Sequence, residues 1–153
     1  MRDSKRAFLA VAFAVLAAPA CGRVIINQPV NRQGDAWHLT LRVLSDGPNG
    51  YSAGNTNYTP SRGERFIWAH VTLHNDQPIP RKFNFDRCDL DLGDGAVVPA
   101  LIDADAIVNW TANHEPELAP GETITRKLIF AYPRDKSPTR LYCAPMVIAL
   151  PQF

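Results

Sequence analysis

The sequence predicts an all-β fold, an antiparallel β-sandwich of about seven strands, and three observations carry this prediction. Several segments alternate apolar and polar residues with a period of two, which is typical of a strand buried on one face. Thirteen prolines and nine glycines are spread through the chain and separate these segments by turns. After the N-terminal apolar run, no segment sustains a helical period.

The first strand is predicted at WHLTLRVL, residues 37–44, and the next at ERFIWAHVTLHN, residues 64–75. In the second strand Phe66 and Trp68 lie opposite the aliphatic residues, so this strand should be central and covered on both faces. Residues 45–63 between the two strands are crowded with turn-forming residues and predict a long loop. The residues predicted to face the core are Trp37, Leu39, Leu41, Val43, Ile67, Ala69, Val71 and Leu73.

The middle of the chain predicts two more alternating strands, KFNF and CDLDL, which end at a Gly-Asp-Gly hairpin turn at residues 93–95. The returning strand AVVPA contains Pro99, which confines it to a sheet edge or a bulge because proline cannot donate to a ladder. GETITRKLIFAYP and RLYCAPMVIAL predict the last strands of the domain. The inward residues of the former are predicted to be Ile124, Leu128 and Phe130.

Three features together resemble a known family: the strand GERFIWAHVTLHND, the turn LAPGET at residues 118–123, and a following strand that ends in IFAYP. This combination is similar to the telokin-like, immunoglobulin-like domain of unknown function found in bacterial extracytoplasmic lipoproteins, to which a mycobacterial secreted immunogenic protein is related. The resemblance covers residues 36–150. It implies an immunoglobulin-like sandwich at an extracytoplasmic location, and it implies no activity.

The N-terminus predicts export from the cytoplasm. Residues 1–6 carry three basic side chains against one acidic one, and residues 7–18 are wholly apolar. As a helix this apolar run would rise only about 18 Å, too short for a hydrocarbon core of about 30 Å. Together with the small residues at 18–20, these regions make up a secretory signal peptide. The predicted organisation is a signal peptide at 1–20, a short tether at 21–35 and the sandwich domain at 36–153.

Two cleavages remain open at the end of the signal peptide. Residues 18–20 suit an ordinary signal peptidase, but the same residues followed by Cys21 resemble a bacterial lipobox, in which the cysteine is acylated. The chain has three cysteines, and an odd thiol in an exported protein needs an explanation. Lipidation of Cys21 would leave Cys88 and Cys143 to form a disulfide in an oxidising compartment. We therefore predict a lipid-anchored protein of the bacterial cell envelope, with a soluble secreted or periplasmic protein as the alternative.

Charge and motifs exclude several classes of function. Without residues 1–20 the chain keeps 13 of its 16 basic and 14 of its 15 acidic residues, a net charge of −1. Nucleic-acid binding is therefore not expected, because it calls for a concentrated basic face. The sequence contains no G-x-S-x-G motif, and the serines after the signal peptide all lie in turn-like contexts. Nucleophilic catalysis is therefore not favoured. We expect a non-enzymatic protein without a cofactor, which binds a protein or a cell-envelope component.

Four histidines leave a metal site open as part of an alternative, ion-binding function. His70 and His74 share a strand face but lie about 13 Å apart, too far to ligate one ion through bonds of about 2 Å. His38 could approach one of them from a neighbouring strand, and His114 lies in a separate segment. Solvent-facing strand histidines are the simpler interpretation, and no metal site is predicted.

The acidic run between Asp86 and Asp94 suggests calcium, whose oxygen ligands cluster on loops. The run does not have the spacing of an EF-hand. Asp89 and Asp91 should point to solvent if the leucines between and after them point inward. An exposed strand edge followed by a hairpin is therefore the preferred interpretation.

The long connection at 45–63 is the predicted place of partner recognition. Loops at the end of a rigid sandwich commonly bind partners, and connections of this length are usually functional or disordered. Tyr51 and Tyr58, among serines, glycines and asparagines, give this segment the composition of a binding loop. Trp110 in a second loop is the next candidate for contact with a partner.

Overall fold

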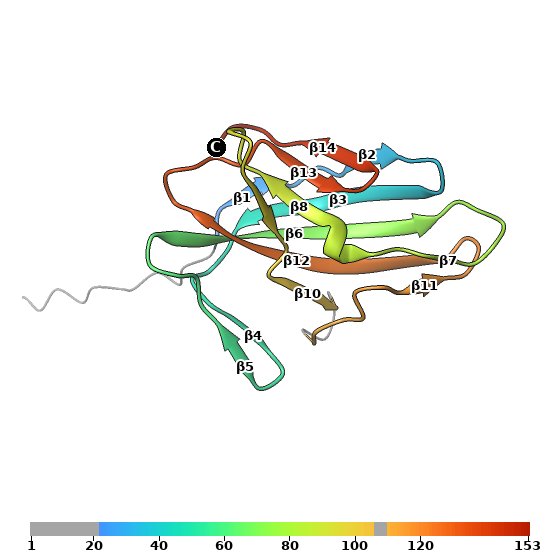
Figure 1. The fold of residues 1–153 in the computed structure, drawn as a ribbon, viewed down its shortest axis with the longest axis horizontal. Helices are drawn as coiled ribbons and strands as arrows, with labels where there is room; N and C mark the ends of the chain where they lie inside the picture. The colour runs from blue at the N-terminus through green and yellow to red at the C-terminus, as the bar shows by residue number, and fades with distance from the viewer. Residues whose placement is uncertain (1–21, 106–109) are drawn as a thin grey trace, which may run out of the picture.

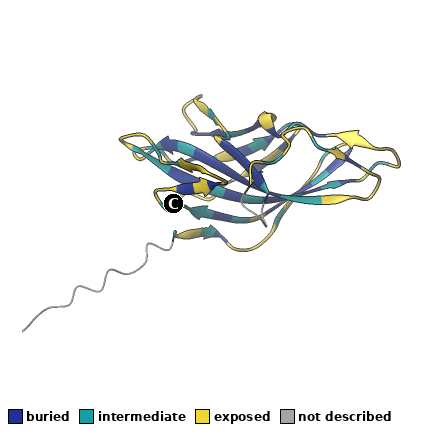
Figure 2. Cartoon of the chain, turned by 90° about the horizontal axis from the view of Figure 1, so that it is seen from below, coloured by how far each residue is buried: buried dark blue, intermediate teal, exposed yellow. Residues whose placement is uncertain are grey.

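The computed structural model describes residues 22–105 and 110–153, which form antiparallel strands and one short 3-10 helix, without an α-helix (Figure 1). Two sheets face each other, and most buried residues line the space between them (Figure 2). The predicted all-β antiparallel sandwich is therefore confirmed. Among the described residues no helical segment could span a bilayer. The predicted signal peptide and Cys21 lie outside these residues.

The larger sheet has six strands. They are β1 (Val24–Ile26), β2 (Val30–Gln33), β3 (Trp37–Asp46), β6 (Glu64–Asn75), β10 (Ile102–Asp105) and β12 (Thr123–Pro133). The order is β1-β3-β6-β12-β10, and β2 pairs with the first half of β3. β6 lies between β3 and β12, which confirms the prediction of a central strand.

The smaller sheet has four strands in the order β14-β13-β8-β9. They are β8 (Cys88–Asp91), β9 (Val97–Pro99), β13 (Arg140–Cys143) and β14 (Met146–Ala149). The turn at residues 93–95 joins β8 to β9 as predicted, with Gly93 and Gly95 at positive φ. Pro99 lies in β9, which is an edge strand, again as predicted.

A short hairpin, a second two-stranded ladder and the 3-10 helix complete the fold. β4 (Tyr51–Ala53) pairs with β5 (Thr56–Tyr58), β7 (Arg81–Lys82) pairs with β11 (Glu117–Leu118), and η1 (Phe85–Arg87) precedes β8. The prediction of a strand at KFNF is wrong beyond Lys82. Asn84 stops the strand because its side-chain oxygen accepts a 2.7 Å hydrogen bond from the Asp86 N–H and caps η1.

The predicted core faces hold except at one bulge. Of the residues predicted to face the core, those of β6 are fully buried, as are Leu128 and Phe130 of β12. In β3 the ladder to β6 shifts register between Leu41 and Val43, so Arg42 is an extra residue. Leu44 therefore takes the core position predicted for Val43, and Val43 is only half-buried. The sequence alternation is regular there, and only the pairing with β6 reveals the bulge.

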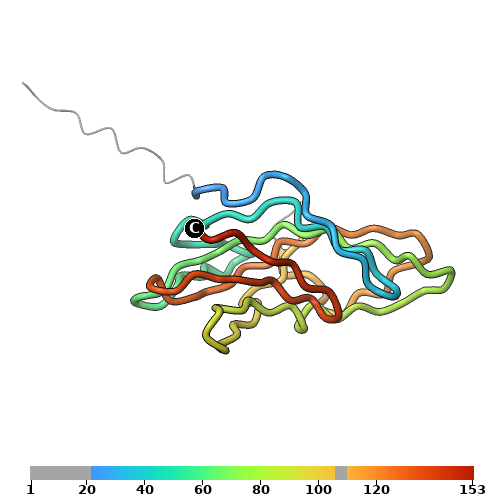
Figure 3. The backbone as a smooth tube through the Cα atoms, turned by 90° about the horizontal axis from the view of Figure 1, so that it is seen from above, coloured from blue at the N-terminus to red at the C-terminus, as the bar shows by residue number. Residues whose placement is uncertain are grey.

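The predicted tether at 21–35 is, from Val24 onward, part of the larger sheet. β1 and β2 both pair with β3, and the chain returns through a turn closed by the 2.7 Å hydrogen bond from the Gly34 N–H to the Trp37 carbonyl. In Figure 3 this N-terminal segment runs beside the C-terminal strands. The Arg32 side chain joins the two by donating to the Val147 carbonyl at 3.1 Å.

Asn75 ties the end of β6 to the Pro-Gly-Glu turn that precedes β12. Its side chain is fully buried and donates to the carbonyls of Ile79 and Leu118 at 2.9 and 3.0 Å. Its side-chain oxygen accepts from the Gln77 N–H at 3.0 Å. Gly121 sits at φ +73°, a conformation that the tight turn requires. Every polar atom of this buried amide therefore has a partner, which fixes where the strand ends.

Candidate functional site

The segment predicted as a long loop, residues 45–63, is largely ordered as a hairpin, so that prediction is wrong for its centre. β3 continues to Asp46, and β4 and β5 follow, with Tyr51 directly opposite Tyr58. Gly54 adopts φ +58° at the turn, where an asparagine follows it. In Figure 1 this hairpin projects from the body of the sandwich beside β10 and β12. Turn residues suited to a hairpin were present in the sequence, but the flanking strands are only three residues long.

The hairpin packs on the outer face of the larger sheet, which is the face directed away from the smaller sheet. Its contacts form a second buried group, here called the outer cluster, which is separate from the core between the sheets. The outer cluster consists of Tyr51, Ala53, Phe66, Ile102, Ala104 and Ile129. Phe66 is fully buried there, as its predicted position on a covered second face requires. Trp68, on the same face of β6, is half-buried and packs against the cluster.

Tyr51 anchors the hairpin through aromatic and cationic contacts. Its ring meets Trp68 edge-to-face, with centroids 5.2 Å apart. The Lys127 ammonium from β12 lies 5.5 Å from the centroids of both rings. Burial lowers the pKa of Lys127, and burial raises the pKa of Tyr51, with a smaller contribution from Tyr58. The hairpin is therefore held on the sheet by a cation between two aromatic rings.

Trp110 stands out because 62% of its surface is exposed. Its backbone is fixed, since its carbonyl accepts from the Asp105 N–H at 2.9 Å and the following residue bridges to Ala104 of β10. A side chain at Gly54 would come within 3.4 Å of the Trp110 ring, so the ring lies at the hairpin turn. An exposed indole on a fixed backbone beside a hairpin presents contact area at low entropic cost.

The structure thus brings the three predicted partner-binding residues to one place, although they differ in exposure. Tyr51 is 5% exposed and Tyr58 is half-buried, so Tyr51 supports the surface and does not form it. Trp68 and Lys127 were missed as members of this region. The sequence indicated this region only through Phe66 and Trp68 on the second face of β6. These residues predicted that another part of the chain covers that face, but not which part.

The histidines lie in three places, and one of them, His114, is beside Asp86 and Asp103. His38 is directly opposite His74 on β3 and β6, as anticipated, and His74 also contacts Thr123 and Asp76. His70 is opposite Lys127, and burial, followed by that lysine, lowers its pKa. Within the described part of the chain, no three histidine, cysteine or acidic side chains are arranged to hold a metal ion.

The aspartates of the acidic run bind different partners. Asp91 accepts from the Gly93 N–H at 2.7 Å and pairs with Arg140 at 3.1 Å. It is 6% exposed, so the prediction that it points to solvent is wrong. Asp94 pairs with Lys136 at 2.7 Å, and this hydrogen bond lowers the pKa of the carboxyl. These aspartates stabilise turns and do not converge on one point.

Asp103 of β10 is a strongly perturbed titratable group on the face of the larger sheet that is directed toward the smaller sheet, since it lies opposite the core residue Leu128. It is 3% exposed, and neither of its oxygens has a hydrogen-bond partner. Its nearest cation is Arg126, with Nε 3.5 Å from Oδ1, and His114 lies 3.9 Å from Oδ2. Burial raises the pKa of Asp103 to about 6, against the opposing effect of Arg126. This carboxylate does not line the cavity beside Trp37 and Phe83 or the one beside Asp89 and Tyr142.

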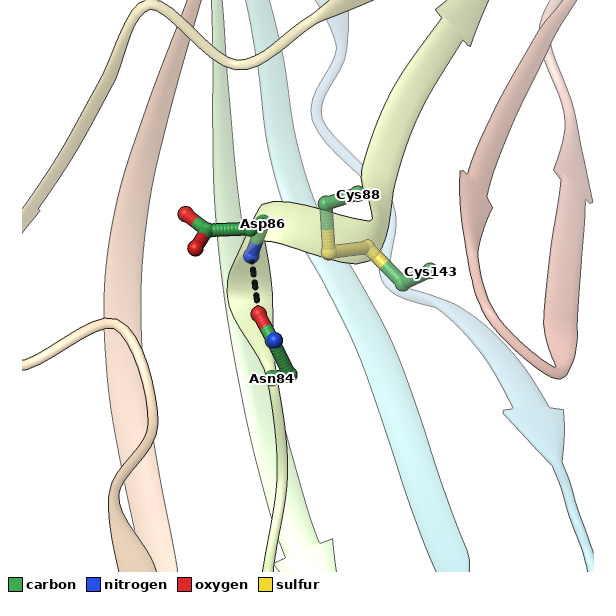
Figure 4. Close-up of a disulfide and its surroundings, with 4 residues drawn as sticks. All are labelled: Asn84, Asp86, Cys88 and Cys143. Atoms are coloured by element: carbon green, nitrogen blue, oxygen red, sulfur yellow. Dashed lines mark hydrogen bonds between the residues drawn. A yellow bond between two sulfur atoms is a disulfide. The ribbon is translucent and has the colours of Figure 1, made fainter.

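Cys88 and Cys143 form the predicted disulfide, which joins two neighbouring strands of the smaller sheet (Figure 4). The two residues are direct partners in the ladder between β8 and β13, and both are fully buried. Figure 4 also shows the η1 cap, in which Asn84 accepts from Asp86, next to the disulfide. The bond closes a loop of 55 residues and is compatible with an oxidising, extracytoplasmic compartment.

Comparison with known proteins places the fold among bacterial sandwich domains. A family model described as a domain of unknown function, DUF4352, matches residues 33–149. No curated protein matches the chain significantly.

Several solved structures share the fold at low sequence identity. A conserved hypothetical protein from Bacillus anthracis superposes with a TM-score of 0.60 at 13% identity, over 84% of this chain and 95% of that one. An uncharacterised β-sandwich protein from Clostridium difficile 630 superposes with a TM-score of 0.54 at 14% identity, over 82% of this chain and 89% of that one. A candidate lipoprotein from Bacillus subtilis gives 0.53 at 10% identity, over 78% of this chain and 37% of that one. At such identities the likeness establishes the fold alone.

Proposed function

The chain belongs to the DUF4352 family, and from that premise we propose that it is a non-enzymatic, extracytoplasmic domain that binds a protein or a component of the cell envelope. The family description assigns no activity, so the proposal is built on the surface of this chain. Its contact surface is the hairpin of β4 and β5 together with Trp110, here called the hairpin surface.

The observation that carries the proposal is the exposed ring of Trp110. A large aromatic side chain that is 62% exposed keeps apolar area in contact with water, which is unfavourable unless a partner covers it. Single exposed hydrophobic residues are common on protein surfaces. This one, however, has a fixed backbone and lies beside a hairpin whose outward residues are polar and small, a composition suited to adaptable contacts.

The outer cluster supports this surface by holding the hairpin on the sheet. Binding residues are usually carried by connections that a rigid scaffold positions. Here the scaffold is the pair β6 and β12, and the anchors are Tyr51 and Lys127. The aspartates and histidines, by contrast, pair with separate partners, which favours protein or envelope binding over ion storage.

Photo-crosslinking from position 110 tests the hairpin surface. A photoreactive phenylalanine in place of Trp110 should crosslink to one dominant component of intact envelopes, whereas the same residue at Val97, which is 58% exposed on edge strand β9, should not. Trp110→Ala should then reduce co-purification of that component at least tenfold, and Val97→Ala should leave it unchanged. Equal crosslinking from both positions, or none from either, would reject the hairpin surface.

We also propose that Cys21 carries the lipid that attaches the protein to the membrane. The lipobox-like sequence supports this, and so does the pairing of Cys88 with Cys143, which leaves Cys21 as the remaining cysteine. The candidate lipoprotein among the similar structures is compatible with it. Labelled palmitate should be incorporated by the natural chain and lost on Cys21→Ser. A mature protein that begins at an unmodified residue and is soluble outside the cytoplasm would establish ordinary secretion.

The sandwich is further proposed to be immunoglobulin-like and related to the mycobacterial secreted immunogenic protein. The strand, Pro-Gly-Glu turn and strand that carried the resemblance correspond here to β6, the Gly121 turn and β12, which are neighbours in one sheet. Superposition of experimental structures should reproduce the order β1-β3-β6-β12-β10 in the mycobacterial protein. A different strand order would reject the relation.

A further inference from the structure

The end of the sandwich at which β3 begins contains a cavity that is remote from the hairpin surface. Its volume is about 350 Å³, within the range of small-molecule sites. Four separate segments form it: the start of β3, the chain from β7 through η1, the segment before β11, and the turn between β13 and β14. The lining residues used below are Trp37, Lys82, Phe83, Arg87, Glu115 and Pro145.

The floor of the cavity is aromatic and held in place from several sides. Trp37 and Phe83 are 6% and 3% exposed, and their rings meet edge-to-face with centroids 5.3 Å apart. Phe83 continues the stack onto Phe85 at 4.9 Å. This floor is therefore preformed, so a ligand would not have to order it on binding.

The disulfide fixes the part of the cavity wall that Arg87 and Ala144 form. Arg87 directly precedes Cys88 and Ala144 directly follows Cys143, so the bond between the two cysteines holds both lining segments together. The Ala144 N–H also donates to the Arg87 carbonyl at 3.3 Å. The distance between the arginine and the turn that carries Pro145 is therefore set by covalent and backbone constraints.

The rim of the cavity carries two cations against one carboxylate. Lys82 and Arg87 are exposed, and within the described chain neither side chain has a salt-bridge partner, although Glu117 lies opposite Lys82 in the ladder. Glu115 supplies the carboxylate. Two unpaired cations beside an aromatic floor suit an anion with an attached apolar group, and Glu115 can accept a hydrogen bond from an N–H donor.

We propose that this cavity binds the carboxylate end of an N-acylated amino acid or peptide with an apolar last side chain. The carboxylate pairs with Arg87 and Lys82, the apolar side chain covers Trp37 and Pro145, and the amide N–H donates to Glu115. The binding energy comes mainly from charge-assisted hydrogen bonds, with a smaller contribution from apolar area that leaves water, because Trp37 and Phe83 are already almost fully buried.

The position of the cavity fits recognition at a distance from the N-terminus. β1 begins beside the far end of β3, where the Asp46 N–H donates to the Arg23 carbonyl at 2.8 Å. Nine residue steps of about 3.3 Å separate Trp37 from Asp46, which places the cavity about 30 Å from the start of the described chain. A membrane anchor at Cys21, as proposed above, would leave the cavity open toward solvent, but the cavity itself does not depend on that anchor.

Titration of the mature protein with three small probes tests the proposal. The probes are N-acetylphenylalanine, its neutral amide and acetate, followed by NMR shifts of the indole and ring signals of Trp37 and Phe83. We expect saturable shifts with N-acetylphenylalanine and at least tenfold weaker binding of the amide and of acetate. Arg87→Gln and Lys82→Gln should each weaken the first probe about tenfold, whereas Arg62→Gln, an exposed arginine elsewhere, should leave it unchanged.

Each other result overturns the proposal. Equal affinity for the amide would remove the role of the two cations, and equal affinity for acetate would remove the role of the aromatic floor. Absence of saturable shifts at Trp37 and Phe83, in a protein whose circular dichroism is unchanged, would show that the cavity does not bind this class of ligand. Loss of the hairpin surface by Trp110→Ala should not alter these titrations, which separates the two proposals.

Discussion

The core between the sheets and the outer cluster beneath the hairpin are both apolar, but they are secured differently. The former combines fully buried aliphatic residues of β3, β6 and β12 with a disulfide and with Asn75, whose amide is completely paired. The latter has six buried residues and is bordered by Lys127, an ionisable group whose burial is unfavourable. The core therefore contributes most of the free energy of unfolding, and the outer cluster is the part that can open locally.

This contrast explains why recognition is proposed for surfaces at the margins of the fold. A hairpin that rests on a small cluster can adjust to a partner without disturbing the six-stranded sheet. The cavity beside Trp37 differs because it is built from the stable part and is constrained by the disulfide. The hairpin surface should thus adapt on binding, and the cavity should behave as a preformed site.

Removal of the disulfide should have the largest effect on stability. Cys88→Ser with Cys143→Ser should lower the free energy of unfolding by about 4 kcal/mol in the chain-entropy model for a loop of this length. The measurement is denaturant unfolding followed by tryptophan fluorescence. Cys21→Ser is the matched control and should leave the midpoint unchanged. Two titratable thiols at these positions in the denatured, unreduced protein would contradict the pairing.

The second prediction concerns Asn75, the polar anchor of the core. Asn75→Ala should destabilise the protein by about 3 kcal/mol, because the carbonyls of Ile79 and Leu118 would lose their buried donor. Asn31→Ala, which removes an exposed amide that accepts one hydrogen bond from Thr40, should cost less than about 1 kcal/mol. Similar midpoints for the two variants in urea unfolding would reject the role given to Asn75.

The stable part of the fold could largely be predicted from the sequence, because its strands are long enough to show their alternation. The alternation predicts β6 and β12, the Gly-Asp-Gly residues predict the turn between β8 and β9, and the cysteine count predicts the disulfide. The bulge at Arg42, the hairpin of β4 and β5 and the burial of Asp91 were not predicted. The bulge and the burial of Asp91 depend on partners distant in sequence. The hairpin is local, but strands of three residues show too little alternation to be distinguished from turns.

The same reasoning applies to the candidate site. Tyr51, Tyr58 and Trp110 could be named from composition, but only the fold shows that one of them supports the surface while another is exposed. Lys127 and Asp103 have no local signal, since a charged residue within a strand pattern reads as a solvent-facing position. Their burial follows from the hairpin and from the segment before β11, which cover them.

Asp103, on the core-facing side of edge strand β10, should give the stability a measurable pH dependence. Burial raises the folded pKa of Asp103 to about 6, above the ordinary value of an aspartate, so the folded protein holds this proton more tightly than the unfolded chain. The stability should therefore be greatest below about pH 4 for this group and should fall as pH rises toward 6 and above. The charged form costs up to about 3 kcal/mol, less any relief from water that enters the site.

Asp103→Asn tests this assignment by difference. The variant should be more stable than the natural protein at pH 7 by about 2 kcal/mol, and the difference should shrink as the pH is lowered to 4. His114, Asp86, Asp105 and Arg126 also act on this carboxyl, so the difference between the two proteins is the relevant quantity. Asp135→Asn, in an exposed turn, serves as the control and should leave the profile unchanged. A natural protein that becomes more stable relative to Asp103→Asn as pH rises from 4 to 7 would reverse the sign and reject the assignment.

The smallest effect on global stability is expected for Tyr51, and it tests whether the outer cluster opens independently of the core. Tyr51→Ala removes the ring that contacts Trp68 and Lys127, and it should lower the free energy of unfolding by only about 2 kcal/mol because the site is small and close to solvent. Amide hydrogen exchange should accelerate strongly within the hairpin. The amides of β6 and β12 should accelerate only as much as the loss of global stability requires. Tyr51→Phe keeps the ring and should retain most of the protection of the hairpin. If Tyr51→Ala accelerated exchange equally in the hairpin and in β6, the two regions would unfold as one unit, and the hairpin surface could not adapt to a partner on its own.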